Sequence, residues 1–134
     1  MSRITIIDDE NCTMWCYPEK KMIRHEFHQF THGEPFNNIL TQGVEAFKEY
    51  GCDRWLSDDR KLNIVHPDNY SWGDKNWAPV ILEAGWKYWA VLMPLKTTGQ
   101  MSSRRLIQYF SEKNVTVQVF EDVDLAMSWL EEQP

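Results

Sequence analysis

The sequence predicts a single α/β domain over residues 1–134, with an N-terminal β-hairpin followed by alternating strands and helices. The length of 134 residues fits one domain and leaves no room for two. Hydrophobic residues make up 43% of the chain and charged residues 25%, as in an ordinary globular protein. From residue 35 onward, helical periods alternate with short strand-like runs, which predicts right-handed crossovers, a mixed but mostly parallel sheet and about four helices.

The first part of the chain is the predicted hairpin. Residues 4–7 form a β-branched run that ends at an acidic turn. Residues 12–17 and 22–28 are two further strand-like runs, separated by a polar turn that begins with Pro18. Strand-like runs on either side of such a turn are typical of antiparallel strands, which we expect at one side of the sheet.

The first helix is predicted to begin with Pro35, whose missing N–H costs nothing at the first helical position, and to stop at Gly51. Apolar residues recur along one face of this segment at helical spacing. They are Phe36, Ile39, Leu40, Gly43, Val44 and Phe47. A short strand over residues 53–57 comes next and ends in a polar cluster.

A second helical region is predicted between Pro67 and Gly85, with His66 at its start. Ser71 with Asp74 three residues later resembles a capping box. Pro79 lies inside the region and predicts a break about one turn earlier, because proline cannot donate a helical hydrogen bond.

Residues 86–93 form the most hydrophobic run and predict a central strand buried on both faces, with Trp86 and Trp89 on opposite sides. A helix over about residues 99–113 and a strand over 115–120 should follow. Asp122 is the expected N-cap of a last helix.

Charge and cysteine content narrow the classes of function. The chain has 14 Lys and Arg against 20 Asp and Glu, a net charge of −6, which disfavours nucleic-acid and membrane partners. No segment resembles a secretory signal or a membrane span. Three cysteines, an odd number, favour a reducing compartment over a disulfide framework, so we expect a cytoplasmic protein.

Three segments, residues 53–60, 77–85 and 117–130, resemble a family of small uncharacterised bacterial proteins of the STAS-like (SpoIIAA-like) class. The element order also looks like the STAS fold of anti-sigma-factor antagonists, and the resemblance spans nearly the whole chain. It implies a regulatory module without catalysis. In those antagonists a serine after the corresponding strand is phosphorylated, which implies Ser57 as the phospho-acceptor, although this chain has Ser57-Asp58-Asp59-Arg60 where the family has an Asp-Ser-Ser-Gly-like start.

The residues themselves indicate where a ligand could bind. In open α/β sheets ligands bind beyond the carboxyl ends of the strands. We therefore expect a polar rim after residues 53–57, above which the next helical region would place aromatic rings. The ligand- or partner-binding candidates are Asp58, Asp59, Arg60, Asn63, Trp72 and Trp77. A solvated salt-bridge cluster and a tryptophan-rich core are the alternative interpretations.

Metal and catalytic motifs are weak. His25, His28 and His32 have helical metal-site spacing but lie in a predicted strand and turn, where residues 25 and 28 face opposite sides. Cys12 and Cys16 lack a second ligand pair nearby. The sequence thus predicts no metal, no cofactor and no catalytic residue.

Three functions remain open after these observations. The first is a regulatory or binding module that recognises a protein partner or a small apolar or anionic ligand. The second is a small enzyme using Asp59, Arg60 or His66 in a cleft at the carboxyl ends of the strands. The third is a homodimeric structural protein without ligand.

Overall fold

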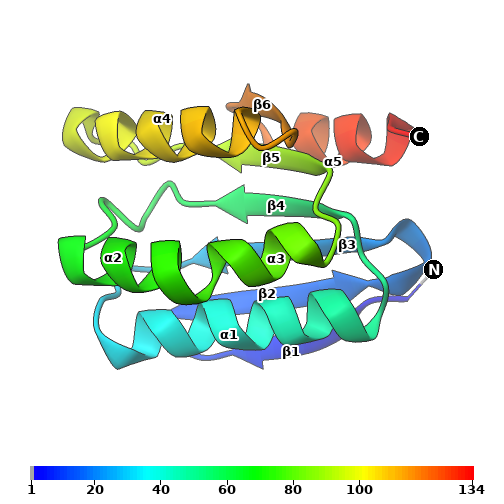
Figure 1. Cartoon of the computed structure of the whole chain (residues 1–134), viewed down its shortest axis with the longest axis horizontal. Helices are drawn as coiled ribbons and strands as arrows, with labels where there is room; N and C mark the ends of the chain where they lie inside the picture. The colour runs from blue at the N-terminus through cyan, green and yellow to red at the C-terminus, as the bar shows by residue number, and fades with distance from the viewer. Residues whose placement is uncertain (1) are drawn as a thin grey trace.

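A computed structural model describes residues 2–134 and shows one six-stranded mixed sheet with the strands in sequential order (Figure 1). The first three strands pair antiparallel, and each later strand pairs parallel to the one before it. The strands are β1 (Ile4–Asp8), β2 (Cys12–Tyr17), β3 (Met22–Phe27), β4 (Arg54–Asp58), β5 (Tyr88–Leu92) and β6 (Thr116–Phe120).

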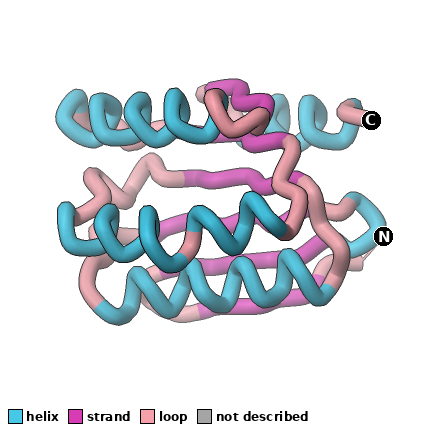
Figure 2. Tube along the Cα trace, viewed as in Figure 1, coloured by secondary structure: helices cyan, strands magenta, loops and turns pink. Residues whose placement is uncertain are grey.

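The helices lie on both faces of this sheet. They are α1 (Glu34–Glu49), α2 (Pro67–Asn76), α3 (Ala78–Glu83), α4 (Thr97–Ser111) and α5 (Val123–Glu132), with a short 3₁₀ turn, η1 (Pro18–Lys20), between β2 and β3. Helices α1 to α4 cover one face, and α5 lies across the other, against β4, β5 and β6 (Figures 1 and 2). Successive right-handed crossovers that step to the next strand in one direction place their helices on the same face.

The predicted α/β class and the antiparallel N-terminal strands are therefore confirmed. The predicted break before Pro79 occurs at Trp77, between α2 and α3. The expected capping box is wrong: Ser71 lies inside α2, and His66 is the N-cap, with Nδ1 accepting the Asp68 N–H at 3.1 Å. Proline at the first helical position favours a start directly after His66.

A second correction concerns Trp86. This residue precedes β5, and its ring lies 5.2 Å from the ring of Trp89, in the same core. The strand alternation that separates neighbouring side chains does not apply before Tyr88, where the regular strand begins.

The sheet separates two apolar cores. The larger one lies under α1 to α4 and contains most of the aromatic side chains. The smaller one, under α5, consists of Met22, Leu56, Ala90, Leu92, Ala126 and Leu130. All five residues of β4 are buried because helices cover this strand on both faces.

Two glycines permit helices to pack closely against β4 and the loop that follows it. A Cβ at Gly43 of α1 would collide with the ring of Trp55, so this glycine makes room for the indole. A Cβ at Gly99 of α4 would collide with the Asn63 carbonyl, so α4 packs directly on the loop after β4. The Gly99 contact brings α4 close to the carboxyl end of β4, and the Gly43 contact brings α1 against Trp55, the second residue of that strand.

None of the helices formed by residues 2–134 has the length and apolar character that a membrane crossing requires.

Candidate functional site

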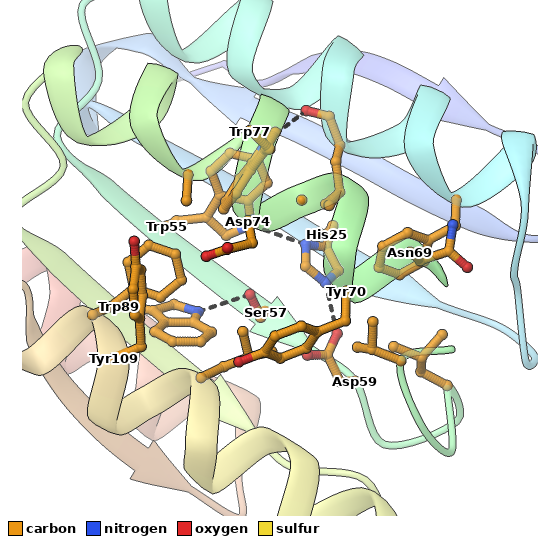
Figure 3. Close-up of a pocket in the computed structure, with 18 of the residues that line it drawn as sticks. His25, Trp55, Ser57, Asp59, Asn69, Tyr70, Asp74, Trp77, Trp89 and Tyr109 are labelled. Carbon is orange, nitrogen blue, oxygen red and sulfur yellow. Dashed lines mark hydrogen bonds and ion pairs between the residues drawn. The ribbon is translucent and has the colours of Figure 1, made fainter. Parts of the chain in front are cut away.

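A partly enclosed cavity of about 100 Å³ lies between the sheet and the helices α1, α2 and α4 (Figure 3). Four of the seven tryptophans line it, namely Trp55, Trp77, Trp86 and Trp89. The wall is mostly apolar, and a few polar side chains face the space from β3, β4 and α2. Such a combination of apolar walls and few polar groups is typical of small-molecule sites.

A hydrogen-bonded chain crosses the floor of the cavity. Trp55 Nε1 donates to His25 Nδ1 at 2.9 Å, and His25 Nε2 lies 2.7 Å from Asp59 Oδ1 (Figure 3). An indole nitrogen can only donate, so Nδ1 of His25 must be an acceptor, and the ring proton must be on Nε2. His25 is therefore a neutral donor to the Asp59 carboxylate, and both of its nitrogens are occupied.

Ser57 forms a second polar contact on the floor. Its side chain is buried, and Oγ accepts a hydrogen bond from Trp89 Nε1 at 2.8 Å (Figure 3). In the parallel pairing of β3 and β4, Ser57 is the register partner of His25. The two side chains therefore share one face, but the hydrogen bonds of His25 go to Trp55 and Asp59.

Asp58 and Asp59 were both named as candidates from the sequence. Their side chains point to opposite faces of the sheet, as those of adjacent strand residues should. Asp59 lines the cavity, while Asp58 is buried on the other side and pairs with Arg60. Arg60 Nε and Nη2 lie 2.9 and 2.8 Å from the two Asp58 oxygens. These hydrogen bonds raise the pKa of Arg60 above its ordinary value. Asp58 and Arg60 thus form a bidentate salt bridge away from the cavity.

The remaining sequence candidates are divided between cavity and surroundings. Trp77 lines the cavity and donates from Nε1 to the Leu40 carbonyl at 2.8 Å. Trp72 is half-buried and packs against the main core without lining the cavity. Asn63 is half-buried, with φ of +77°, in the loop that supports α4.

The mouth of the cavity is formed by α2 and α4. Tyr70 and Asp74 line it from α2, and Tyr109 lines it from α4 (Figure 3). Asn69 is fully engaged by α1, because it hydrogen-bonds the Gly33 backbone and Asn37 Oδ1. This bonding holds α2 in place at the mouth.

The other histidines lie outside the cavity. His28 lies 2.7 Å from Thr13 Oγ1 and faces away from His25, as strand alternation predicts. His32 and His66 stack at 5.8 Å between ring centroids. Within residues 2–134, no group of three or more His, Cys, Asp or Glu side chains is placed to hold a metal ion.

Sequence reasoning considered His25 only for its metal-site spacing, and it named neither His25 nor Trp89 nor the mouth residues as ligand-binding candidates. One signal was available: His25 occupies a core-facing position between Ile23 and Phe27 in a strand with alternating burial. A polar side chain at such a position needs a buried partner. The identity of that partner, on another strand, could not be read from local spacing.

Comparison with protein families, curated proteins and solved structures gives no match to the chain.

Proposed function

We propose that this protein is a STAS-like binding module that holds a compact apolar molecule in the cavity beneath α2 and α4. The observation that carries the proposal is the cavity itself, with aromatic walls and a small polar floor. Apolar cavities of about 150 Å³ in proteins take up a benzene-sized molecule. A partly enclosed space of about 100 Å³ suits a single ring whose remainder reaches the mouth. The STAS-like part of the proposal is supported by element order and by the three similar segments.

The hydrogen bonds on the floor support binding rather than nucleophilic catalysis. A serine nucleophile needs a neighbouring base with a free lone pair. The Nδ1 lone pair of His25 is taken by Trp55, and its Nε2 proton is directed at Asp59. Ser57 therefore has no activating base in this arrangement. Of the residues that the small-enzyme alternative named, Asp59 lines the cavity, while Arg60 pairs with Asp58 and His66 lies outside the lining.

The proposal is tested with ethylbenzene and a cavity-filling variant. Leu106 lines the cavity from α4, whereas Met101 lies on the same helix with 63% of its surface exposed. Leu106→Trp should weaken ethylbenzene binding at least tenfold, because the larger ring fills the space. Met101→Trp should keep the affinity within twofold. Indole N–H signals in two-dimensional NMR report binding, and equal affinity of both variants would contradict the proposal.

Protein-partner recognition and a homodimer are the alternative proposals. Native mass spectrometry of the purified protein, compared with its denatured mass, separates them. A ligand mass on a monomer favours the cavity, a ligand-free dimer favours self-association, and a bare monomer favours another protein partner. Tandem mass spectrometry of peptides from the protein of its native cells tests the phospho-acceptor proposal for Ser57, because it shows whether that residue carries a phosphate.

A further inference from the structure

The indole N–H groups around the cavity are not available to a ligand, because each already donates to an acceptor of the protein. The aromatic walls therefore present ring faces and edges to the space. The acceptors are His25 Nδ1 for Trp55, the Leu40 carbonyl for Trp77, the Tyr88 carbonyl for Trp86 and Ser57 Oγ for Trp89.

Asp59 is a carboxylate that forms no ion pair with a lysine or arginine side chain of residues 2–134. Its side chain is 17% exposed, and among residues 2–134 the side chain that hydrogen-bonds it is His25, through Oδ1. Since Trp55 keeps that imidazole neutral, the ring supplies a hydrogen bond but no positive charge. Oδ2 of Asp59 keeps its capacity to accept a hydrogen bond.

The other lining residues add no compensating charge. None of the lining residues within 2–134 is lysine or arginine, and Asp74 contributes a second carboxylate at the mouth. Carboxylates in apolar surroundings are stabilised by a cationic partner. The negative faces of aromatic rings attract cations as well, most strongly those of tryptophan.

We propose that the ligand of this cavity is a small organic ammonium ion, with its apolar part against the tryptophan rings and its N–H groups donating to Asp59. This inference rests on the proposed binding function and names its ligand class. The sequence left open a small apolar or an anionic ligand, and this inference departs from the anionic one, because the carboxylates of the lining repel an anion. His25 acts as a positioning residue, since its hydrogen bond to Oδ1 orients the Asp59 carboxylate (Figure 3).

The test uses ligands that share a benzyl skeleton and differ in one group. Benzylammonium carries a charged donor, benzyl alcohol a neutral donor and ethylbenzene a methyl group, while benzoate carries the opposite charge. Calorimetry at neutral pH and low salt should give benzylammonium an affinity at least tenfold higher than that of the alcohol or the hydrocarbon. Benzoate should bind most weakly.

Two carboxylate-to-amide variants separate the local charge from the net charge of the protein. Asp59→Asn keeps an acceptor for His25 and should lower the preference for benzylammonium over ethylbenzene at least tenfold. Asp68→Asn removes the same charge from a side chain that is 94% exposed and outside the cavity lining, and should change neither affinity by more than twofold.

The outcomes distinguish this inference from the binding function on which it rests. If ethylbenzene binds as tightly as benzylammonium, or Asp59→Asn leaves the preference intact, the ammonium inference is overturned and the cavity function stands. If benzyl alcohol equals benzylammonium, Asp59 selects a donor rather than a charge, which also overturns it. If no member of the series binds, the proposed function fails as well.

Discussion

The imidazole of His25 is held between a donor and an acceptor, and these two partners determine its protonated nitrogen. We expect long-range ¹H–¹⁵N NMR at neutral pH to show the Nε2–H tautomer, because the indole of Trp55 can only donate to Nδ1. In a Trp55→Phe variant the indole donor is gone, so the imidazole should no longer be restricted to the Nε2–H tautomer. An Nδ1–H tautomer in the unaltered protein would contradict the hydrogen-bonded chain from Trp55 to Asp59.

The buried thiol of Cys12 provides a second prediction at the level of a single residue, and it concerns the pH dependence of stability. Burial, with a smaller contribution from the Asp9 charge, raises the pKa of its thiol from 9.0 to about 12. Below pH 9 the thiol is mostly protonated in both the folded and the unfolded chain. Between these two pKa values the unfolded chain loses the proton and the folded chain keeps it, so stability falls as pH rises, by about 1.4 kcal/mol per pH unit at most.

Cys12→Ala should therefore flatten the alkaline decline in the free energy of unfolding, measured by urea denaturation from pH 8 to 11. Ile7→Val is the matched control in the same core, since it changes apolar packing and adds no ionisable group. An unchanged slope in the alanine variant would show that the folded thiol ionises near its ordinary pKa.

Helix α4 is placed by its contact with the loop after β4. A methyl group at Gly99 would meet the Asn63 carbonyl, so Gly99→Ala should cost about 1–3 kcal/mol or more in overpacking. Gly73 of α2 has nothing within 4 Å of a Cβ, so Gly73→Ala should instead stabilise the protein by about 1 kcal/mol through helix propensity. Urea unfolding of the two variants checks that their free energies of unfolding change in opposite directions.

Helix α5 stabilises the opposite face of the sheet, and the strands β4 and β5 are shared by both cores. Leu130 is fully buried there, so Leu130→Ala should lower the free energy of unfolding, measured in urea, by about 2–5 kcal/mol.

Because the two cores share strands β4 and β5, the whole molecule should unfold in one step. The near-ultraviolet signal of the tryptophans and the far-ultraviolet signal should change at the same urea concentration, and separate transitions would indicate two units.

Several features of the fold follow from the sequence alone. Helix α1 is determined by Pro35, its apolar stripe and Gly51, and α5 by the cap at Asp122, whose carboxylate accepts from the backbone of Asp124 and Leu125. These signals are local, because caps and helical periods involve residues a few positions apart. The divergence of Asp58 and Asp59 is equally local, since strand alternation dictates it.

The cavity and its chemistry were decided by tertiary structure. Asp59 and Trp77 were predicted from their place beyond the strand and in the next helical region, but the sequence grouped them with Asp58, Arg60, Asn63 and Trp72, which lie outside the lining. His25 and Asp59 are 34 positions apart and meet only because β3 and β4 pair in parallel register. Strand order and register set such contacts, and they depend on the packing of the whole chain.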